Sequence, residues 1–328
     1  MTPTDTPPVI GILAVGGAGP YGDISNEELQ KLRTDYVTEI SRAGGTPIIL
    51  PSTQKSDAEI HSALDQCDGL VLTGGVDVNP LLYGSFPEPG TDTPDVPRDT
   101  VESRYQRVAH ERGMPQFGIC RNAQLMNVLG GGTLTQTLNE VDEKVDHQPA
   151  TDHFGTHWVE FAAGSELSRA YGTNGANVMT YHQQGVLQHQ LSDEFEPVAW
   201  SGKAVEAFIR KGNWTKAGQG YSYAEPPFAM GVQWHSEARN KYLPPEERRA
   251  VPELVLIVNK SAEYRDRHKP AQQSRQLLHH DRPSTHTSFS PIKKSPGGVL
   301  LPKQHRPREA ASGPPAFPHR GRAGHTHR

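Results

Sequence analysis

The chain has 328 residues, enough for one large domain or two modest ones. A hydrophobic fraction of 34%, only two cysteines and the lack of a long apolar run exclude membrane-spanning, collagen-like and disulfide-scaffold proteins. The N-terminus has neither a basic nor an apolar segment, so together with the two cysteines it predicts a protein of the reducing cytoplasm.

The formal net charge of −4 conceals two parts of opposite sign. Residues 1–264 carry a net charge of −14, whereas residues 265–328 carry +10. The second part is rich in Pro, His, Ser and Arg and has no apolar periodicity, which predicts a basic disordered tail after one folded domain. A basic arm for nucleic acid or an acidic partner is the alternative, but the tail has almost no aromatic residues for base stacking.

Strands and helices are predicted to alternate in the first part of the chain. Apolar, β-branched runs predict buried strands at 9–15, 46–50, 69–73 and 116–119. Helical periodicity and capping residues predict helices at 26–43, 57–66, 99–112 and 122–129. This order is typical of βαβ units, so we expect an α/β fold with a mostly parallel sheet flanked by helices.

The pattern changes after residue 150. Short strands with intervening turn signals are predicted at 158–161, 178–181, 195–200, 205–209 and 228–234. No linker or internal repeat separates them from the first part. We therefore expect a single domain over residues 1–264, in which an antiparallel portion is added to the parallel sheet.

Cys120 is the first candidate catalytic residue. It lies where the strand predicted at 116–119 meets a helix expected to start near Asn122, and Gly118 precedes it by two positions. A tight strand–turn–helix bend would expose the thiol and direct backbone N–H groups toward it. Such surroundings favour a thiolate nucleophile and offer an oxyanion site. A buried structural cysteine is the alternative, and it is the interpretation that we adopt for Cys67.

His235 and Glu237 follow the last strong predicted strand. In an extended chain, residues i and i+2 project to the same side, about 6.6 Å apart. Glu237 is therefore expected to hydrogen-bond the His235 ring and fix its tautomer, as a nucleophile's base requires. A solvated surface pair is the alternative. Asp99 and Glu102 are predicted to form ion pairs near a helix start rather than an acid–base pair.

Two further patterns are weak. His153 and His157 have the i,i+4 spacing of metal ligands, but Gly155 argues against a helix between them. The segment 17–22 matches G-x-G-x-x-G, but Pro20 interrupts it and no acidic residue follows the second strand. We therefore predict no metal and no nucleotide site.

Taken together, these features resemble the class I glutamine amidotransferase-like superfamily. Within it, they resemble the γ-glutamyl-γ-aminobutyrate hydrolase branch, peptidase family C26. The segment 72–84 is similar to the branch's G-G-x-D-x-x-P-x-x-Y-G signature, and residues 98–102 to its R-D-x-x-E. The nucleophile segment 117–134, the Y-H-x-Q segment 181–184 and the segment 231–237 complete the resemblance, which covers residues 9–264.

This resemblance implies an activity and a triad. Cys120 would attack the γ-glutamyl amide bond of a γ-glutamylated amine and form a thioester, with release of the amine and then of glutamate. His235 would act as acid and base, and Glu237 would orient it. No metal or organic cofactor is required.

The resemblance also implies where the substrate lies. The backbone N–H groups of Gly75 and Arg121 would form the oxyanion hole. By motif position, Arg121, Gln124 and His182 are the expected substrate-binding residues.

The chain departs from the family pattern at four places. Asn122 stands where Gly is usual, Ser236 where Pro is usual, and Gln183 where a second His is usual. Residues 179–180 are Met-Thr instead of Asn-Ser. These positions surround the expected site, so they bear on substrate specificity more than on the chemistry.

Two other functions remain open from the sequence. The chain could be a glutaminase that supplies ammonia to a separate synthase, or a non-catalytic binding protein on the same fold. The expected partner is a small γ-glutamyl molecule, with no membrane; nucleic acid would have only the basic tail to bind. A homodimer and, for a glutaminase, the synthase are the protein partners left open.

Overall fold

The structure is a computed structural model that describes residues 6–14, 26–51, 56–149, 154–212 and 226–268. The glycine-rich segment 17–22, His153 and residues 269–328 lie outside the described residues, so the predictions made for them stay predictions. Residues 265–268, assigned to the tail from the sequence, instead form the end of a helix.

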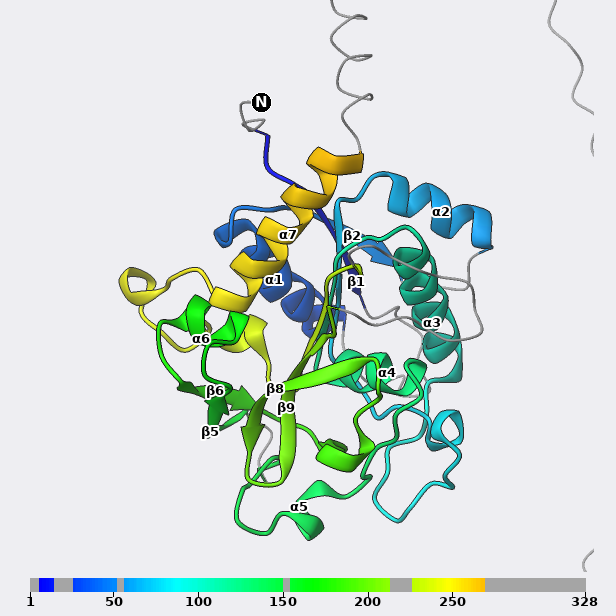
Figure 1. The fold of residues 1–328 in the computed structure, drawn as a ribbon, viewed down its shortest axis with the longest axis vertical. Helices are drawn as coiled ribbons and strands as arrows, with labels where there is room; N and C mark the ends of the chain where they lie inside the picture. Colours follow the sequence, from blue (N-terminus) through cyan, green and yellow to red (C-terminus); the bar gives the residue numbers. More distant parts are fainter. Residues whose placement is uncertain (1–5, 15–25, 52–55, 150–153, 213–225, 269–328) are drawn as a thin grey trace, which may run out of the picture. The chain divides into compact units, whose positions relative to one another are not determined.

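One mixed sheet forms the centre of the fold (Figure 1). Its parallel half has the order β2-β1-β3-β4-β10. These strands are β1 (Val9–Ala14), β2 (Thr46–Pro51), β3 (Gly69–Leu72), β4 (Gln116–Ile119) and β10 (Ala229–Val232). The carboxyl ends of β3, β4 and β10 are neighbours at one edge, which is where open α/β sheets place their ligands.

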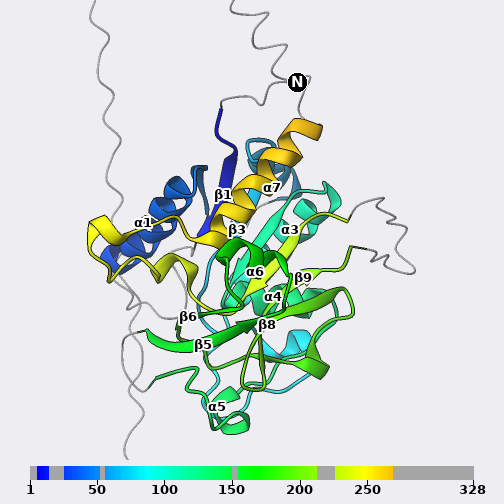
Figure 2. The ribbon, with the colours of Figure 1, turned by 60° about the vertical axis from the view of Figure 1, so that its left-hand side comes forward.

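The other half of the sheet is antiparallel and continues the order as β10-β9-β8-β5-β6, with β7 paired to β9. It consists of β5 (Gly155–Phe161), β6 (Gly175–Thr180), β7 (Val186–Leu187), β8 (Phe195–Ser201) and β9 (Ala204–Arg210). Figure 2 shows β5, β6 and β8 side by side below the parallel strands. The expected parallel sheet with an antiparallel addition is confirmed.

Helices cover both faces of the parallel half. In Figure 1, α1 (Asn26–Arg42) and α7 (Pro252–His268) lie to its left, and α2 (Asp57–Asp65), α3 (Val96–Glu111) and α4 (Arg121–Leu129) lie to its right. The short helices α5 (Leu138–Val141) and α6 (Glu166–Tyr171) belong to the second half of the chain. Neither of these two, nor α7, was predicted from the sequence.

Each face of the sheet has its own apolar core because side chains alternate along a strand. In β3, Leu70 and Leu72 pack with residues of α2 and α3, whereas Val71 packs on the opposite face with residues of α1 and α7. Glycine allows close packing between the layers: a Cβ at Gly69 would lie 2.0 Å from Ser261 Oγ of α7. The two cores hold the strand ends, and thus the residues that follow them, at fixed positions.

Local sequence sets the starts of the helices. Ser56 caps α2 in a capping box with Glu59, and the helix therefore begins at Asp57, as predicted. Asp95 caps α3, which therefore begins at Val96 rather than at Asp99. The earlier start matters because it places Arg98 inside the first turn of α3.

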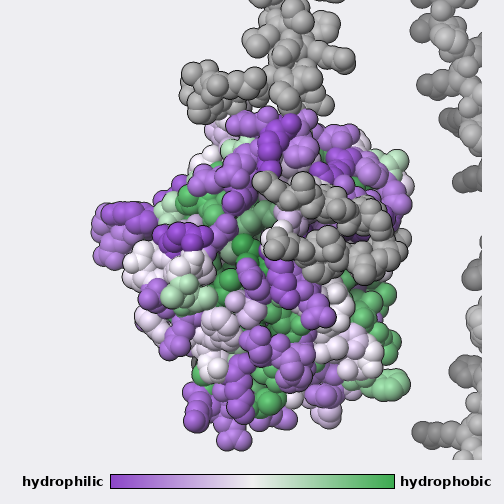
Figure 3. Space-filling view, viewed as in Figure 1, coloured by the Kyte–Doolittle hydropathy of each residue, from purple (hydrophilic) through white to green (hydrophobic). Residues whose placement is uncertain are grey.

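The surface shown in Figure 3 is mainly polar. Exposed large apolar side chains include Leu81, Leu82 and Phe86, in the loop between β3 and α3. Within the described residues, no helix combines the length and the apolar character needed to cross a bilayer.

Candidate active site

Cys120 lies at the turn between β4 and α4. Its φ of 50° and ψ of −112° place it in a backbone region that residues with side chains rarely adopt, and no other described non-glycine residue has a positive φ. The Cys120 N–H donates to the Val232 carbonyl of β10 at 2.8 Å. Its own carbonyl accepts the N–H groups of Ala123 and Gln124 at 3.0 and 3.1 Å. The surrounding structure therefore enforces the predicted bend.

Gly118 makes this bend possible. A Cβ at this position would lie 2.7 Å from the carbonyl oxygen of Asn122, so the first turn of α4 packs directly on β4. Arg121 is the first residue of α4, and the N–H of a first helical residue has no partner within its helix. That N–H belongs to the residue directly after the nucleophile, and its part in an oxyanion hole stays a prediction.

His235 and Glu237 form a close pair. His235 Nδ1 lies 2.6 Å from Glu237 Oε1, and both residues are buried. The predicted contact is present, but the extended backbone from which it was predicted is wrong. His235 precedes a 3₁₀ turn, Ser236–Ala238, and this turn brings the carboxylate back to the ring.

His235 and Cys120 converge on the same glycine. A Cβ on Gly74 would lie 3.0 Å from His235 Cε1 and 3.4 Å from Cys120 Cβ. Burial lowers the pKa of His235, but the charges of Glu237 and Cys120 and hydrogen bonding with both raise it, so that the pKa lies well above its usual value. Phe154 covers the imidazole, with ring centroids 4.6 Å apart. The imidazole is therefore held next to the thiol, in surroundings that favour its positively charged form.

Glu253 anchors the segment that carries His235. One of its oxygens accepts the Trp234 indole N–H at 2.8 Å and the Ser236 hydroxyl at 2.7 Å. The other accepts the Tyr171 hydroxyl at 2.8 Å. Ser236, a departure from the family's proline, thus replaces a rigid ring with a hydrogen bond to α7.

The loop after β3 provides the opposite wall. Arg98 donates to the Gly74 carbonyl at 2.8 Å and to the Thr73 carbonyl at 3.2 Å. Because carbonyl and N–H groups of a trans peptide point in opposite directions, the Gly75 N–H points away from Arg98. A Cβ on Gly75 would lie 2.0 Å from the Arg98 guanidinium, so glycine is required there.

Tyr36 of α1 supports this loop from the other face of the sheet. Its hydroxyl accepts the Gly74 N–H at 3.1 Å. Burial and the nearby charge of Glu237 raise the pKa of Tyr36 well above its usual value, so the phenol stays neutral. Tyr36 lies within the helix predicted at 26–43, and nothing in the sequence indicated that it contacts the site.

A buried ion network links this loop to the nucleophile helix. Glu102 accepts Arg98 Nε at 2.7 Å and also pairs with Arg121, whose second nitrogen pairs with Asp99. The Arg121 side chain is fully buried. Burial raises the pKa of Asp99 to about 6 in spite of the attraction of Arg121. Asp99 and Glu102 are thus ion-pair residues, as predicted.

The residues expected to bind substrate are all buried. The Arg121 guanidinium is held by carboxylates, and Gln124 donates to the Gln184 carbonyl at 2.8 Å and to Gln233 at 3.2 Å. His182 directs Nδ1 to the Gln184 carbonyl at 2.9 Å. In this structure each of the three has a protein partner, so substrate contact by these side chains stays a prediction.

Asn122, which stands where the family usually has Gly, contributes through its side chain. It lies within α4 and does not take an unusual backbone angle, since the positive φ belongs to Cys120. Its side chain donates to the Thr73 carbonyl at 2.6 Å and accepts from Gln106 at 3.1 Å. It therefore ties the nucleophile helix to the end of β3.

Known proteins share this chain's pattern. The peptidase C26 family matches residues 8–237, more than half of the chain. The chain belongs to the peptidase C26 family. The γ-glutamyl-γ-aminobutyrate hydrolase PuuD of Escherichia coli is 31% identical to this C26 protein over 243 residues, which cover 70% of this chain and 85% of that one.

A putative glutamine amidotransferase of Mycobacterium tuberculosis is 34% identical over 206 residues, or 63% of this chain. That alignment spans 62% of the mycobacterial protein. Among solved structures, the glutaminase domain of Trypanosoma brucei CTPS matches with a TM-score of 0.50 and 15% identity, covering 78% of this chain and 94% of that domain, which shows a shared fold. Family and relatives together support a glutamine amidotransferase-like hydrolase.

Proposed function

We propose that this C26 protein hydrolyses the γ-glutamyl amide bond of γ-glutamylated amines through a thioester on Cys120. The observation that carries the proposal is the strained Cys120 turn, which places Cys120 and the paired imidazole of His235 against the same residue, Gly74. A single strained residue among the described non-glycine residues, placed next to a paired imidazole, is the arrangement that nucleophilic catalysis needs.

In the first half-reaction, the Cys120 thiolate attacks the γ-carbonyl carbon. The negative charge that develops on the oxygen is stabilised by the N–H groups of Gly75 and Arg121. His235, in its charged form, gives its proton to the amine nitrogen as the C–N bond breaks. The amine leaves, and the glutamyl group remains on sulfur as a thioester.

In the second half-reaction, neutral His235 takes a proton from water. The resulting hydroxide attacks the thioester carbon, and the C–S bond breaks to regenerate the Cys120 thiolate and release glutamate. Glu237 holds the ring in one tautomer and stabilises the imidazolium in both steps. The two half-reactions together return the proton to His235 and restore the Cys120 thiolate.

Glutamate release from a panel of γ-glutamyl amines, with free glutamine included, tests the proposal. We expect the wild-type protein to release glutamate from γ-glutamyl amines and Cys120→Ala to release none. Cys67→Ala is the matched control. Cys67 is buried in the core, so its substitution should leave the rate of glutamate release unchanged.

Other outcomes would redirect the account. Release from glutamine alone would favour a glutaminase that supplies ammonia to a separate synthase. If no substrate reacts and Cys120 is alkylated by iodoacetamide no faster than a free thiol, the protein is a binding protein. The predicted cytoplasmic location and the protein partners stay predictions.

A further inference from the structure

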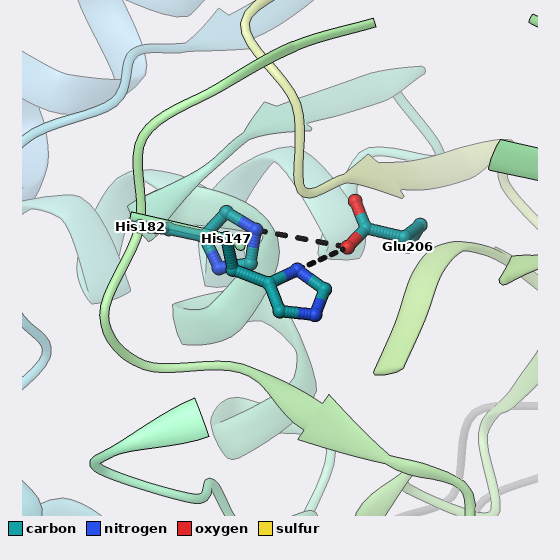
Figure 4. Close-up of side chains that lie close together, drawn as sticks. All are labelled: His147, His182 and Glu206. Atoms are coloured by element: carbon teal, nitrogen blue, oxygen red, sulfur yellow. Dashed lines mark ion pairs between the residues drawn. The ribbon is translucent and has the colours of Figure 1, made fainter. Parts of the chain in front are cut away.

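A second cluster of ionisable side chains lies apart from the triad, around Glu206 of β9. His147 Nδ1 and His182 Nε2 lie 3.2 and 3.6 Å from the same oxygen, Glu206 Oε1. His157 Nε2 lies 3.4 Å from the other oxygen, Oε2. Figure 4 shows both His147 and His182 directed at this carboxylate. Glu206 and the rings of His147 and His182 are almost completely buried.

These facing atoms lie at ion-pair distance from one another, yet in the described part of the chain none of them makes a hydrogen bond of regular geometry. His147 Nδ1, His182 Nε2 and both Glu206 oxygens are buried there without a hydrogen-bond partner. An unpaired buried polar atom costs about 1–3 kcal/mol, and more if it is charged. Four such atoms at one point therefore call for a group that is not part of the chain.

The opposite ring nitrogens show which atoms carry lone pairs. His182 Nδ1 lies 2.9 Å from the Gln184 carbonyl, which can only accept, so Nδ1 bears the proton. His147 Nε2 lies 3.4 Å from an oxygen of Asp142. In neutral rings with these tautomers, the nitrogens that remain, His182 Nε2 and His147 Nδ1, face Glu206 as acceptors. Three acceptors converge, and a cation between them would satisfy all three.

We infer that His147, His182 and Glu206 bind a divalent transition-metal ion, with Zn²⁺ as the best match. Their ligand atoms lie within 4.8 Å of one another. Neighbouring ligands around tetrahedral zinc, each about 2.0–2.1 Å from the ion, are separated by about 3.3 Å. The observed separations of 3.2 and 3.6 Å are close to this edge length. His157 Nε2 lies beside the other carboxylate oxygen and outside this group of three, so a water molecule is expected to complete the tetrahedron.

The surroundings of the cluster match those of known metal sites. A histidine that binds a metal usually donates its other N–H to a carboxylate or a backbone carbonyl. Asp142 is placed to accept such an N–H from His147, and the Gln184 carbonyl to accept one from His182. Asp142 is itself fixed by the Lys203 N–H at 2.6 Å. Imidazole and carboxylate ligands together suit zinc and its neighbours rather than calcium or magnesium.

The sequence did not indicate this site because its ligands come from three separate segments. His157 was considered only with His153, which lies outside the described residues, and Glu206 is one acidic residue in a strand. The site contains no residue of the triad, but it adjoins the triad and shares His182 with the residues expected to bind substrate: Cys120 Sγ lies 3.9 Å from the carbonyl oxygen of Tyr181, the residue before His182. A bound ion would therefore hold residues 181–182 in place beside Cys120.

Metal content of the full chain, purified without a histidine tag, tests the inference. After incubation with Zn²⁺ and gel filtration with a weak chelator, we expect wild type to retain about one equivalent more zinc than His147→Gln or Glu206→Gln. His189→Gln is the matched control, because His189 is an exposed histidine outside the cluster. The histidines of residues 269–328 are the same in all four proteins and cancel in the comparison.

A second measurement does not depend on the variants folding. Co²⁺ added to the metal-free wild-type protein should give the intense visible absorption of a four-coordinate site, and Zn²⁺ should abolish it. Zn²⁺ should also raise the melting temperature of the wild type. Equal zinc content in wild type and both variants, or only the weak absorption of six-coordinate Co²⁺, would overturn the inference.

Discussion

Cys120 is held in a backbone conformation that costs about 1–3 kcal/mol, and the surrounding hydrogen bonds maintain it. Its N–H is bound by β10, and its carbonyl by the first turn of α4. Strain of this kind persists only where neighbouring structure imposes it. At the scale of single residues, the site is therefore built by fixing one thiol and one imidazole in place.

Glu237→Gln should move the pH dependence of the reaction. The charge of Glu237 helps to raise the pKa of His235, so its loss lowers that pKa. His235 then loses its proton at a lower pH, and the basic limb of the kcat/KM profile moves to lower pH. We also expect kcat/KM at its optimum to fall by about 10²-fold or more. An unchanged basic limb would contradict the role given to the pair.

Asn122→Gly restores the residue that is usual in the family, yet we expect it to lower both the stability and the activity of the protein. It removes the hydrogen bonds to the Thr73 carbonyl and to Gln106, which should lower the free energy of unfolding by about 1–3 kcal/mol. Activity should fall as well, because Thr73 precedes the Gly74–Gly75 loop. Urea unfolding and glutamate release measure the two effects; a variant as stable as wild type and more active would disprove this interpretation.

At the scale of elements, α3 and α4 position the two backbone N–H groups that the proposal uses as oxyanion donors. Arg98 of α3 binds the Gly74 carbonyl, so the N–H of Gly75 points away from Arg98. Arg121 provides the other N–H as the first residue of α4. Glu102 pairs with both arginines. The network therefore sets the relative positions of the loop and the nucleophile helix.

Glu102→Gln tests this network. It leaves two buried guanidinium groups short of a carboxylate, and breaking a buried pair costs about 3–5 kcal/mol of stability. Glu111→Gln is the control, because Glu111 lies on the same helix in a partly exposed pair with Arg107, and should change stability by about 0.5 kcal/mol or less. Urea unfolding measures the loss of stability in each variant. An equal loss in both would show that the buried network does not stabilise the fold.

The sequence predicted the elements that carry the site better than those that surround it. The strand at 116–119 has the predicted bounds, and α4 begins only one residue before its predicted start. Both could be predicted because an apolar run bounded by Gly and Pro is a local sequence pattern. Helix α7 was missed although it anchors the His235 segment through Glu253. That role depends on a contact between residues distant in sequence, which periodicity cannot report.

For the same reason, the site was predicted only in part. Cys120, His235 and Glu237 could be found because each pattern is short and local. Tyr36, Arg98 and the Glu206 cluster act through tertiary contacts. Only the folded chain brings them to the thiol, to the Gly74 carbonyl or to one another.

At the scale of the whole molecule, buried carboxyl groups link stability to pH. Burial raises the pKa of Asp77 to about 6 from an ordinary value of 3.8. A carboxyl with a raised pKa in the folded state contributes stability that is present below about 3.8 and is lost as the pH rises through about 6.

Asp77→Asn should therefore flatten the pH dependence of stability. Between pH 5 and pH 8, wild type should lose about 1 kcal/mol more of its free energy of unfolding than the variant does. Asp193→Asn, at an exposed position, is the control and should behave as wild type. Urea unfolding at the two pH values measures the difference, and the same loss in wild type and Asp77→Asn would refute the prediction.

The central claim is that Cys120 carries the glutamyl group during the reaction. Rapid acid quenching followed by intact-mass and peptide mass spectrometry tests it most directly. The account predicts that wild type mixed with a reactive γ-glutamyl amide gains the mass of one glutamyl group on the peptide that contains Cys120, and that Cys120→Ala gains none. Glutamate release without any adduct on Cys120, or with activity retained in Cys120→Ala, would contradict it.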